Sequence, residues 1–227
     1  MRLLIDDSNI ESISALYKLG IFSGITTNPT IIKKSGLPPL ELIKNLLNSF
    51  SGLLFVQCVS SETKEIIQEG EKLYSLNPDR IVLKIPFSKN GLLAAEHFVE
   101  KSIPVTITAI YSFSQVILSS MINVDFVAPY LNRMQNVGID VSIINKMQTY
   151  LENSNTKTKL IVASIKNLEQ FEKIASYNVD FITASSDIYN EIFKNNLTKS
   201  ATEQFNNDWE NIKSKSWVIW LWRGLHE

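Results

Sequence analysis

The chain has 227 residues, of which 44% are hydrophobic and 20% are charged, a composition that suits one compact domain with its own core. The formal net charge of −1 provides no dense basic surface, so we expect neither a nucleic acid nor a membrane as a partner. The single cysteine, Cys58, excludes an intrachain disulfide and, with an N-terminus that lacks signal-peptide features, indicates a cytoplasmic protein.

Short apolar or β-branched runs alternate along the chain with segments of helical periodicity. We predict eight strands, at residues 3–6, 24–28, 53–59, 81–86, 104–110, 126–131, 160–165 and 181–184. Helices of roughly 10–15 residues are predicted after Asn9, Pro39, Ser61, Lys89, Ser112, Asp140, Asn167 and Asp187. Repeated strand–helix units of this length indicate parallel strands with right-handed crossovers.

Such units build either an open doubly wound sheet or a closed barrel. Eight units, and no glycine-rich nucleotide turn after the first strand, favour an α/β fold with a single (β/α)8 TIM barrel. A further helix is predicted at residues 199–213, so residues 1–213 are assigned to a barrel with an additional C-terminal helix.

The last residues, 214–227, form a Trp-rich tail that contains Trp217, Trp220 and Trp222. The tail is either an appended extension, a segment packed outside the barrel, or an anchor for oligomer contacts, where tryptophans are enriched. No stretch approaches about 20 apolar residues, so no membrane span is predicted. His97 and His226 lie too far apart to suggest a metal site with the one cysteine.

If the strands close into a barrel, the inward side chains at their carboxyl ends meet at one mouth. Seven consecutive strands each place polar or ionisable residues there, namely Asp6, Thr26 with Asn28, Gln57, Lys84, Thr108, Tyr130 and Ser164. This regularity predicts an active site at that mouth.

Lys84 lies within the apolar strand IVLKIP, where burial of an unpaired ammonium is costly. Burial lowers the pKa of a lysine and frees its amine as a nucleophile toward carbonyls. Alternatively, Lys84 reaches the rim or forms a static ion pair with Asp6. Asp6 can transfer protons, while Tyr130 and Gln57 can orient a water, unless these groups form only a hydrogen-bond cluster that fills the barrel.

An anion pocket is predicted beside this group. Arg133 follows the sixth strand, and Ser164 and Lys166 follow the seventh, near the place where TIM barrels often hold phosphate. Arg133 alone would be weak support, but its combination with the seventh-strand residues is stronger.

Five segments, LLIDDSN, GITTNPTII, IVLKIP, VAPYLNR and IVASIK, resemble signatures of the transaldolase family, and of its short branch that contains fructose-6-phosphate aldolase. The resemblance runs in order from Leu3 to about Trp209. It implies that Lys84 is the Schiff-base lysine and Asp6 the acid of the first strand. It further implies that Asn28, beside Thr26, contacts donor hydroxyls, that Arg133 and Ser164 bind phosphate, and that the chain forms a homo-oligomer.

Gln57 and Tyr130 resemble the aldolases of this branch, because its transaldolases carry glutamate and phenylalanine there. We therefore expect a class I aldolase that reversibly cleaves fructose 6-phosphate to dihydroxyacetone and glyceraldehyde 3-phosphate, or catalyses a related aldol reaction. No cofactor is expected, and Thr108 helps to hold the water. The alternatives are a transaldolase and a sugar-phosphate-binding barrel without turnover. Asp7 departs from the family pattern, and its charge is expected to shift the ionisation of Asp6.

Overall fold

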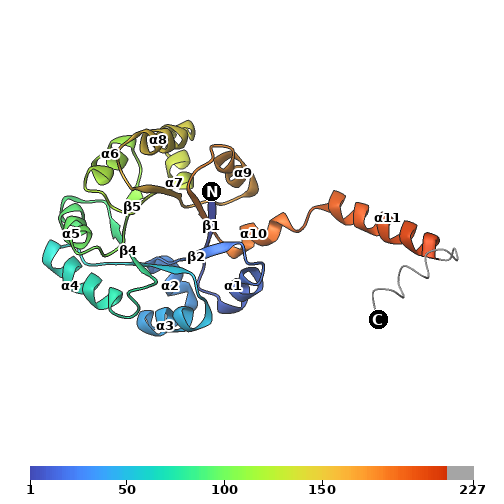
Figure 1. The fold of residues 1–227 in the computed structure, drawn as a ribbon, viewed down its shortest axis with the longest axis horizontal. Helices are drawn as coiled ribbons and strands as arrows, with labels where there is room; N and C mark the ends of the chain where they lie inside the picture. The colour runs from blue at the N-terminus through green and yellow to red at the C-terminus, as the bar shows by residue number, and fades with distance from the viewer. Residues whose placement is uncertain (214–227) are drawn as a thin grey trace. The chain divides into compact units, whose positions relative to one another are not determined.

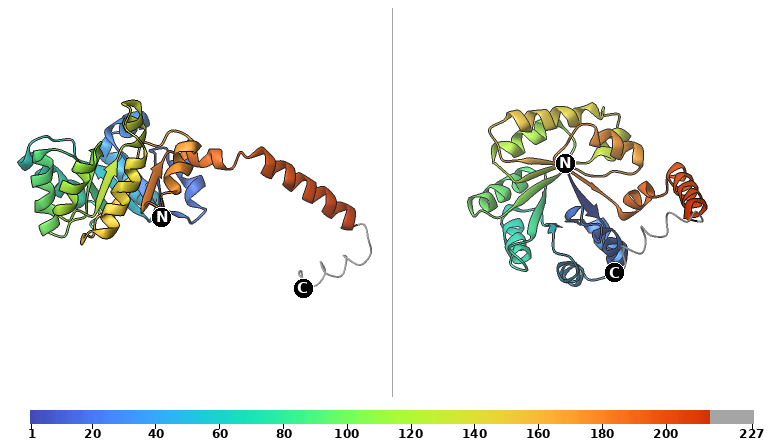
Figure 2. Two further views of the ribbon diagram at one scale, coloured as in Figure 1. Left: turned by 90° about the horizontal axis from the view of Figure 1, so that it is seen from above. Right: turned by 45° about the vertical axis from the view of Figure 1, so that its right-hand side comes forward.

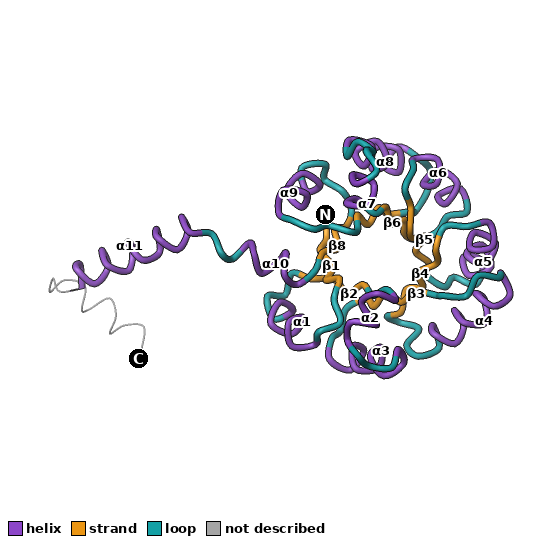
Figure 3. Tube along the Cα trace, turned by 180° about the vertical axis from the view of Figure 1, so that it is seen from behind, coloured by secondary structure: helices purple, strands orange, loops and turns teal. Residues whose placement is uncertain are grey.

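The computed structural model describes residues 1–213, in which eight parallel strands close into a barrel in chain order (Figure 1). The strands are β1 (Arg2–Asp6), β2 (Phe22–Thr26), β3 (Leu53–Gln57), β4 (Ile81–Pro86), β5 (Val105–Ile110), β6 (Phe126–Pro129), β7 (Lys159–Val162) and β8 (Phe181–Ala184). Figure 3 shows these strands as an inner ring that helices surround. Closure through the β1–β8 pairing confirms the barrel and excludes the open sheet.

Helices connect the strands on the outside of this ring, as two further views show (Figure 2). Those of the barrel are α1 (Ile10–Tyr17), α2 (Pro29–Ser35), α3 (Pro39–Ser49), α4 (Thr63–Tyr74), α5 (Lys89–Glu100), α6 (Phe113–Met121), α7 (Leu131–Asn136), α8 (Ser142–Asn153), α9 (Leu168–Ala175) and α10 (Ser186–Ile192). The predicted C-terminal helix is α11 (Asn196–Lys213).

Two of these helices were not predicted from the sequence, and both begin where a predicted strand was extended too far. The strand predicted to end at Asn28 ends at Thr26, because the Asn28 side chain caps α2 by accepting from the Ile31 backbone N–H at 3.1 Å. Similarly, β6 ends at Pro129 and α7 follows at once. The predicted helix starts at Asn9, Ser112 and Asn167 are correct, since each of these side chains caps its helix.

The inside of the barrel is divided into an apolar layer and a polar layer. The apolar layer contains Leu4, Phe55, Val82, Ala128, Ile161 and Phe181. On β1, β3, β4 and β8, the residue two positions further along each strand is polar, namely Asp6, Gln57, Lys84 and Thr183. Because side chains two apart share a face, the apolar layer supports the polar layer at the carboxyl ends of the strands. Between strands and helices, a second apolar core includes Ile5, Leu83, Phe98 and Ile107.

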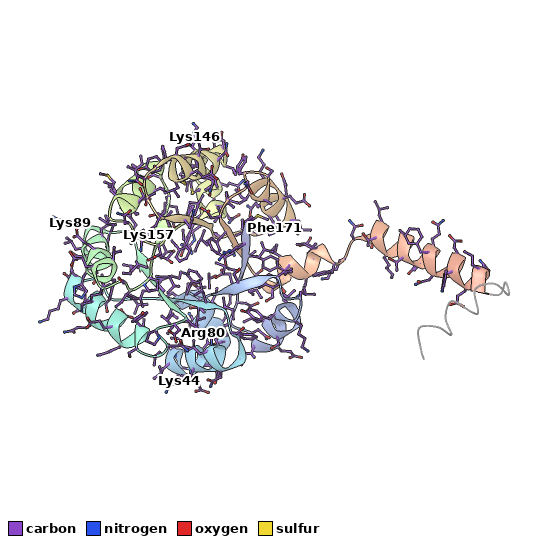
Figure 4. All side chains as sticks on the ribbon, in the orientation of Figure 1. Lys44, Arg80, Lys89, Lys146, Lys157 and Phe171 are labelled. Atoms are coloured by element: carbon purple, nitrogen blue, oxygen red, sulfur yellow. The ribbon has the colours of Figure 1, made fainter. Side chains whose placement is uncertain are left out.

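The opposite end of the barrel is held by side-chain bonds to the backbone. The Arg80 guanidinium, labelled in Figure 4, donates to the carbonyls of Leu47, Phe50 and Gly52, and so ties the turn before β3 to the start of β4. Asp125 accepts from the first N–H of β5, and Asp180 accepts from the Leu160 N–H of β7. Polar groups therefore fix this end, while the carboxyl ends of the strands are left to carry the polar layer.

The chain separates into two compact units, Met1–Tyr189 and a second that begins at Asn190 and contains α11. The predicted Trp-rich tail at 214–227 lies outside the described residues. Among residues 1–213, no helix is both long and apolar enough to cross a membrane. No group of three potential metal-ligating side chains occurs within the same described range.

Candidate active site

A cavity of about 350 Å³ opens at the carboxyl ends of the strands. The strands β1, β3, β4, β5 and β8 contribute lining residues, and the segments that follow β2, β6 and β7 contribute the others. The lining residues are Asp6, Asn28, Pro29, Thr30, Ile31, Lys34, Gln57, Lys84, Ala109, Tyr130, Arg133, Ala163, Ser164, Lys166 and Thr183. The structure thus brings the sequence-predicted residues together, except that Thr26 and Thr108 lie behind the wall and bond to residues that line it.

Lys84 is 6% exposed and lies on β4, between Gln57 of β3 and Thr106 of β5 in the barrel register. Its Nζ atom donates to the Thr27 carbonyl at 2.5 Å. Among the described residues, Lys84 and Asp6 do not form an ion pair, because their charged atoms are more than 4.0 Å apart. Burial lowers the pKa of Lys84, and attraction by Asp6 only partly opposes that effect. The lysine therefore does not snorkel to the rim, and its amine is disposed toward the neutral, nucleophilic form.

Asp6 accepts from the Thr26 hydroxyl at 2.6 Å, and that hydroxyl is also 2.6 Å from the Thr183 hydroxyl. Burial raises the pKa of Asp6, while Lys84, the Thr26 hydrogen bond and Lys166 lower it. Asp7 also raises this pKa, as its charge predicts, but its contribution is the smallest of these causes. The Asp7 carboxylate instead accepts from the backbone N–H groups of Ser8 and Asn9. Burial and these polar neighbours thus act in opposite directions on the pKa of Asp6.

Tyr130, Thr108 and Gln57 form the third part of the site. The Thr108 hydroxyl donates to the Tyr130 phenol oxygen at 3.0 Å. Burial raises the pKa of Tyr130, so the phenol keeps its proton at neutral pH. Gln57 Oε1 is buried without a hydrogen-bond partner among the described residues, and Gln57 lines the cavity. Because buried polar groups are normally hydrogen-bonded, this amide oxygen is able to accept from a molecule that enters the cavity.

The residues that were predicted to bind an anion lie together on the cavity wall. The Arg133 guanidinium stacks over the Tyr130 ring at 4.9 Å and donates to the Tyr111 hydroxyl at 3.2 Å. Ser164 lines the cavity with a left-handed backbone, φ 63°, and Lys166 lines it from the same loop. One guanidinium, one ammonium and one hydroxyl thus converge at the ends of β6 and β7.

Seven residues that line the cavity were not predicted from the sequence, namely Pro29, Thr30, Ile31, Lys34, Ala109, Ala163 and Thr183. Lys34 belongs to α2, which was not predicted, and Ala109 reaches the wall through an irregularity of β5. Thr183 could have been found, because it occupies the inward position at the end of β8. Lys34 also lines an adjoining cavity of about 440 Å³ together with Asp6, Asp7, Ser8, Asn9, Ile10, Ile31, Ser35, Leu37, Ser185 and Asp187.

The sequence model of the transaldolase/fructose-6-phosphate aldolase family matches residues 3–219 of this chain. The chain belongs to this family. A probable transaldolase of Dictyoglomus turgidum is 34% identical over 213 residues, which cover 93% of this chain and 99% of that protein. Probable transaldolases of Carboxydothermus hydrogenoformans and Brevibacillus brevis are 31% and 30% identical, and each comparison covers 94% of this chain and 100% of the relative.

As a member of the transaldolase/fructose-6-phosphate aldolase family, the chain is an enzyme of the class I aldolase or transaldolase type. This sets aside a barrel without turnover. Inosine 5′-monophosphate dehydrogenase from Legionella pneumophila is similar with a TM-score of 0.59 at 9% identity, covering 83% of this chain and 58% of that one. A 3-hexulose-6-phosphate synthase is similar with a TM-score of 0.57 at 13% identity, and the comparison covers 84% of this chain and 92% of that protein. At these identities the likeness concerns the fold alone.

Proposed function

We propose that Lys84 forms a Schiff base with a ketose and that the enzyme cleaves fructose 6-phosphate to dihydroxyacetone and glyceraldehyde 3-phosphate. The observation that carries this proposal is a buried lysine with a lowered pKa that lines a polar cavity at the barrel mouth. The imine supplies the electron sink for carbon–carbon cleavage, so the chemistry requires no cofactor.

In the proposed reaction, the neutral Lys84 amine adds to the ketone carbonyl, and loss of water gives a protonated imine. Asp6 takes the proton of the hydroxyl on the far side of the scissile bond. That bond then breaks to release the aldehyde, and its electron pair moves into the imine to leave an enamine. A water held by Tyr130, Gln57 and Thr108 protonates the enamine carbon, and hydrolysis of the imine frees the ketone and Lys84.

The substrate ends are assigned from the chemistry of the walls. Asn28, with Thr26 behind it, is suited to the donor hydroxyls, while Arg133, Ser164 and Lys166 are suited to the phosphate. The second candidate is a transaldolase, which passes the enamine to an acceptor sugar, and the names of the relatives favour it. An assay with fructose 6-phosphate alone, and then with added erythrose 4-phosphate, separates cleavage from transfer.

Borohydride reduction in the presence of dihydroxyacetone tests the shared intermediate, because reduction fixes an imine as a stable secondary amine. Peptide mass analysis should place the adduct on Lys84. An adduct on another lysine, or no adduct under conditions where turnover is measured, would exclude the proposed mechanism.

The pH dependence of trapping should move to lower pH in Asp6→Asn. The negative charge of Asp6 raises the pKa of Lys84, so its removal lowers that pKa further. Imine formation requires the unprotonated amine, and the trapping rate therefore rises with pH through this pKa. We expect the rising part of the profile to shift downward, measured by initial rates of borohydride-dependent labelling. Asp7→Asn is the control and should leave the profile nearly unchanged, whereas an upward shift in Asp6→Asn would contradict the assignment.

Arg133→Ala should raise the KM for phosphorylated aldehydes in the synthetic direction and spare unphosphorylated ones. A charge-assisted hydrogen bond is worth about 1.5–3 kcal/mol, or about 10- to 150-fold in binding. Kinetics with glyceraldehyde 3-phosphate and with glyceraldehyde measure the two effects in one variant. Equal losses on both aldehydes would instead indicate that Arg133 supports the Tyr130 ring.

We also propose a cytoplasmic homo-oligomer. Support comes from α11, in which Leu197, Phe205 and Trp209 are 82%, 67% and 42% exposed, since large apolar side chains of this kind are normally covered in an assembly. Truncation after Lys215 should leave the barrel folded, because all eight strand–helix units precede that point. Thermal unfolding and sedimentation velocity measure fold and mass together. A smaller assembly would assign the tail to an interface, and loss of folded protein would contradict the prediction.

A further inference from the structure

The alternation of side chains on β5 is broken just before the strand ends. Val105 and Ile107 pack in the outer core, and Thr108 points inward to Tyr130. Regular alternation would direct Ala109 to the helices and Ile110 into the barrel. Instead, Ile110 packs in the outer core and Ala109 lines the cavity. The β5–β6 register shifts between Thr108 and Ile110, which identifies a β-bulge with one extra residue on β5.

The extra residue has a backbone conformation that alanine disfavours. Ala109 has φ 57°, in the left-handed region, where an L-residue crowds its own backbone. Ser102, Asn123, Ser164 and Asn178 share this conformation in the described chain, and all four have short polar side chains. Ser164 follows β7 at the cavity, and the other three lie in helix-to-strand loops. Ala109 has no such side chain to compensate locally. Strained positions of this kind persist where the surrounding structure holds them, and they cluster at active sites.

Both residues that flank Ala109 are bonded to Tyr130. On one side, the Thr108 hydroxyl donates to the Tyr130 phenol oxygen at 3.0 Å. On the other side, the Ile110 carbonyl accepts from the Tyr130 backbone N–H at 3.1 Å. The Thr108 carbonyl also accepts from the Phe87 N–H at 2.9 Å, which anchors the bulge to the loop after β4. The bulge is therefore hydrogen-bonded to both the backbone N–H and the phenol oxygen of Tyr130, and its backbone conformation determines the position of the phenol.

We infer that Ala109 is a positioning residue for proton transfer, which holds Thr108 and Tyr130 at the spacing needed to protonate the enamine. This inference rests on the proposed function. An alanine at this point both lines the cavity with a methyl group and restricts the backbone more tightly than glycine would. The left-handed conformation is thus part of the proton-transfer apparatus, whereas imine formation at Lys84, whose register partner Thr106 precedes Ala109 by three residues, does not depend on it.

Ala109→Gly tests this assignment, because glycine adopts the same conformation without strain but does not enforce it. Exchange of the carbon-bound hydrogens of dihydroxyacetone with D₂O, followed by NMR, reports enamine formation and protonation. We expect the kcat of exchange to fall about 10- to 100-fold, since small displacements of a catalytic group have effects of this size. The KM for dihydroxyacetone and the borohydride labelling of Lys84 should change little, and the melting temperature should stay the same or rise. Ser102→Gly, which makes the same backbone change in a distant loop, should leave exchange unaltered.

Native exchange rates in Ala109→Gly, with native labelling of Lys84, would overturn the inference. A parallel loss of exchange and labelling would also overturn it, because the bulge would then shape the whole cavity rather than proton transfer. Failure of the native enzyme to be labelled at Lys84 would instead remove the proposed function, so the two failures are distinguishable.

Discussion

Lys84→Met is expected to reduce borohydride trapping of dihydroxyacetone to background and to abolish turnover, while the barrel stays folded. Methionine keeps an unbranched side chain in the space between Gln57 and Thr106 but provides no amine. The replacement also removes a buried group whose charged form is disfavoured, so the free energy of unfolding should be preserved or increased. Activity and labelling are measured on the same preparation, and circular dichroism with thermal unfolding establishes the fold.

The control is Lys89→Met, at an exposed lysine that begins α5 and is labelled in Figure 4. This variant should be labelled at Lys84 by borohydride and dihydroxyacetone, and should turn over substrate, as the native enzyme does. Residual activity of the Lys84 variant above a few parts per thousand would require another nucleophile, and labelled Lys34 or Lys166 would identify the candidates within the cavity.

Tyr130→Phe is expected to lower cleavage of fructose 6-phosphate to free dihydroxyacetone by about 100- to 10,000-fold, the usual worth of a positioned proton donor. The phenol oxygen accepts from Thr108 at 3.0 Å and retains its own proton because burial raises the pKa of Tyr130. Without that hydroxyl, the enamine persists until an acceptor aldehyde arrives. Cleavage is followed by release of dihydroxyacetone, and transfer is followed by formation of the new ketose from erythrose 4-phosphate.

Adding Gln57→Glu to Tyr130→Phe should raise the ratio of transfer to cleavage further, because the transaldolases of this branch carry glutamate at the position of Gln57. Arg133→Ala is the comparison variant, since it weakens phosphate binding without removing the proton donor. If the native enzyme already transfers faster than it cleaves, the choice of aldolase over transaldolase is wrong, although the role of Lys84 stands.

The barrel and much of its mouth could be predicted because the side-chain period of a strand is two. Counting from Leu4, Phe55 and Val82 to the residues two positions further along each strand leads directly to Asp6, Gln57 and Lys84. The same step from Phe181 leads to Thr183, which was overlooked. The alternation of side chains therefore predicts Thr183 as well as the three residues that were identified.

Ala109 and Lys34 could not be predicted in the same way. A β-bulge changes the phase of alternation by one residue, and nothing in the run VTITAIYS marks where that happens. Lys34 depends on α2, a helix of seven residues whose start is fixed by the Asn28 cap and Pro29 rather than by hydrophobic periodicity. Local backbone chemistry, and not patterning, decides both positions.

Pairing of β1 with β8 places the first and last strands of the barrel side by side, since Arg2 aligns with Phe181 and Ile5 with Ala184. The Tyr189 hydroxyl then bonds to the Leu4 carbonyl at 2.9 Å. During synthesis on the ribosome, β1 must wait for roughly 180 further residues, or on the order of 10–40 seconds at about 5–20 residues per second. Throughout that interval its outer edge has no partner and is open to pairing with other nascent chains. Chaperone demand and the yield of expression should therefore respond to changes in β8 more strongly than to equal losses of equilibrium stability elsewhere in the ring.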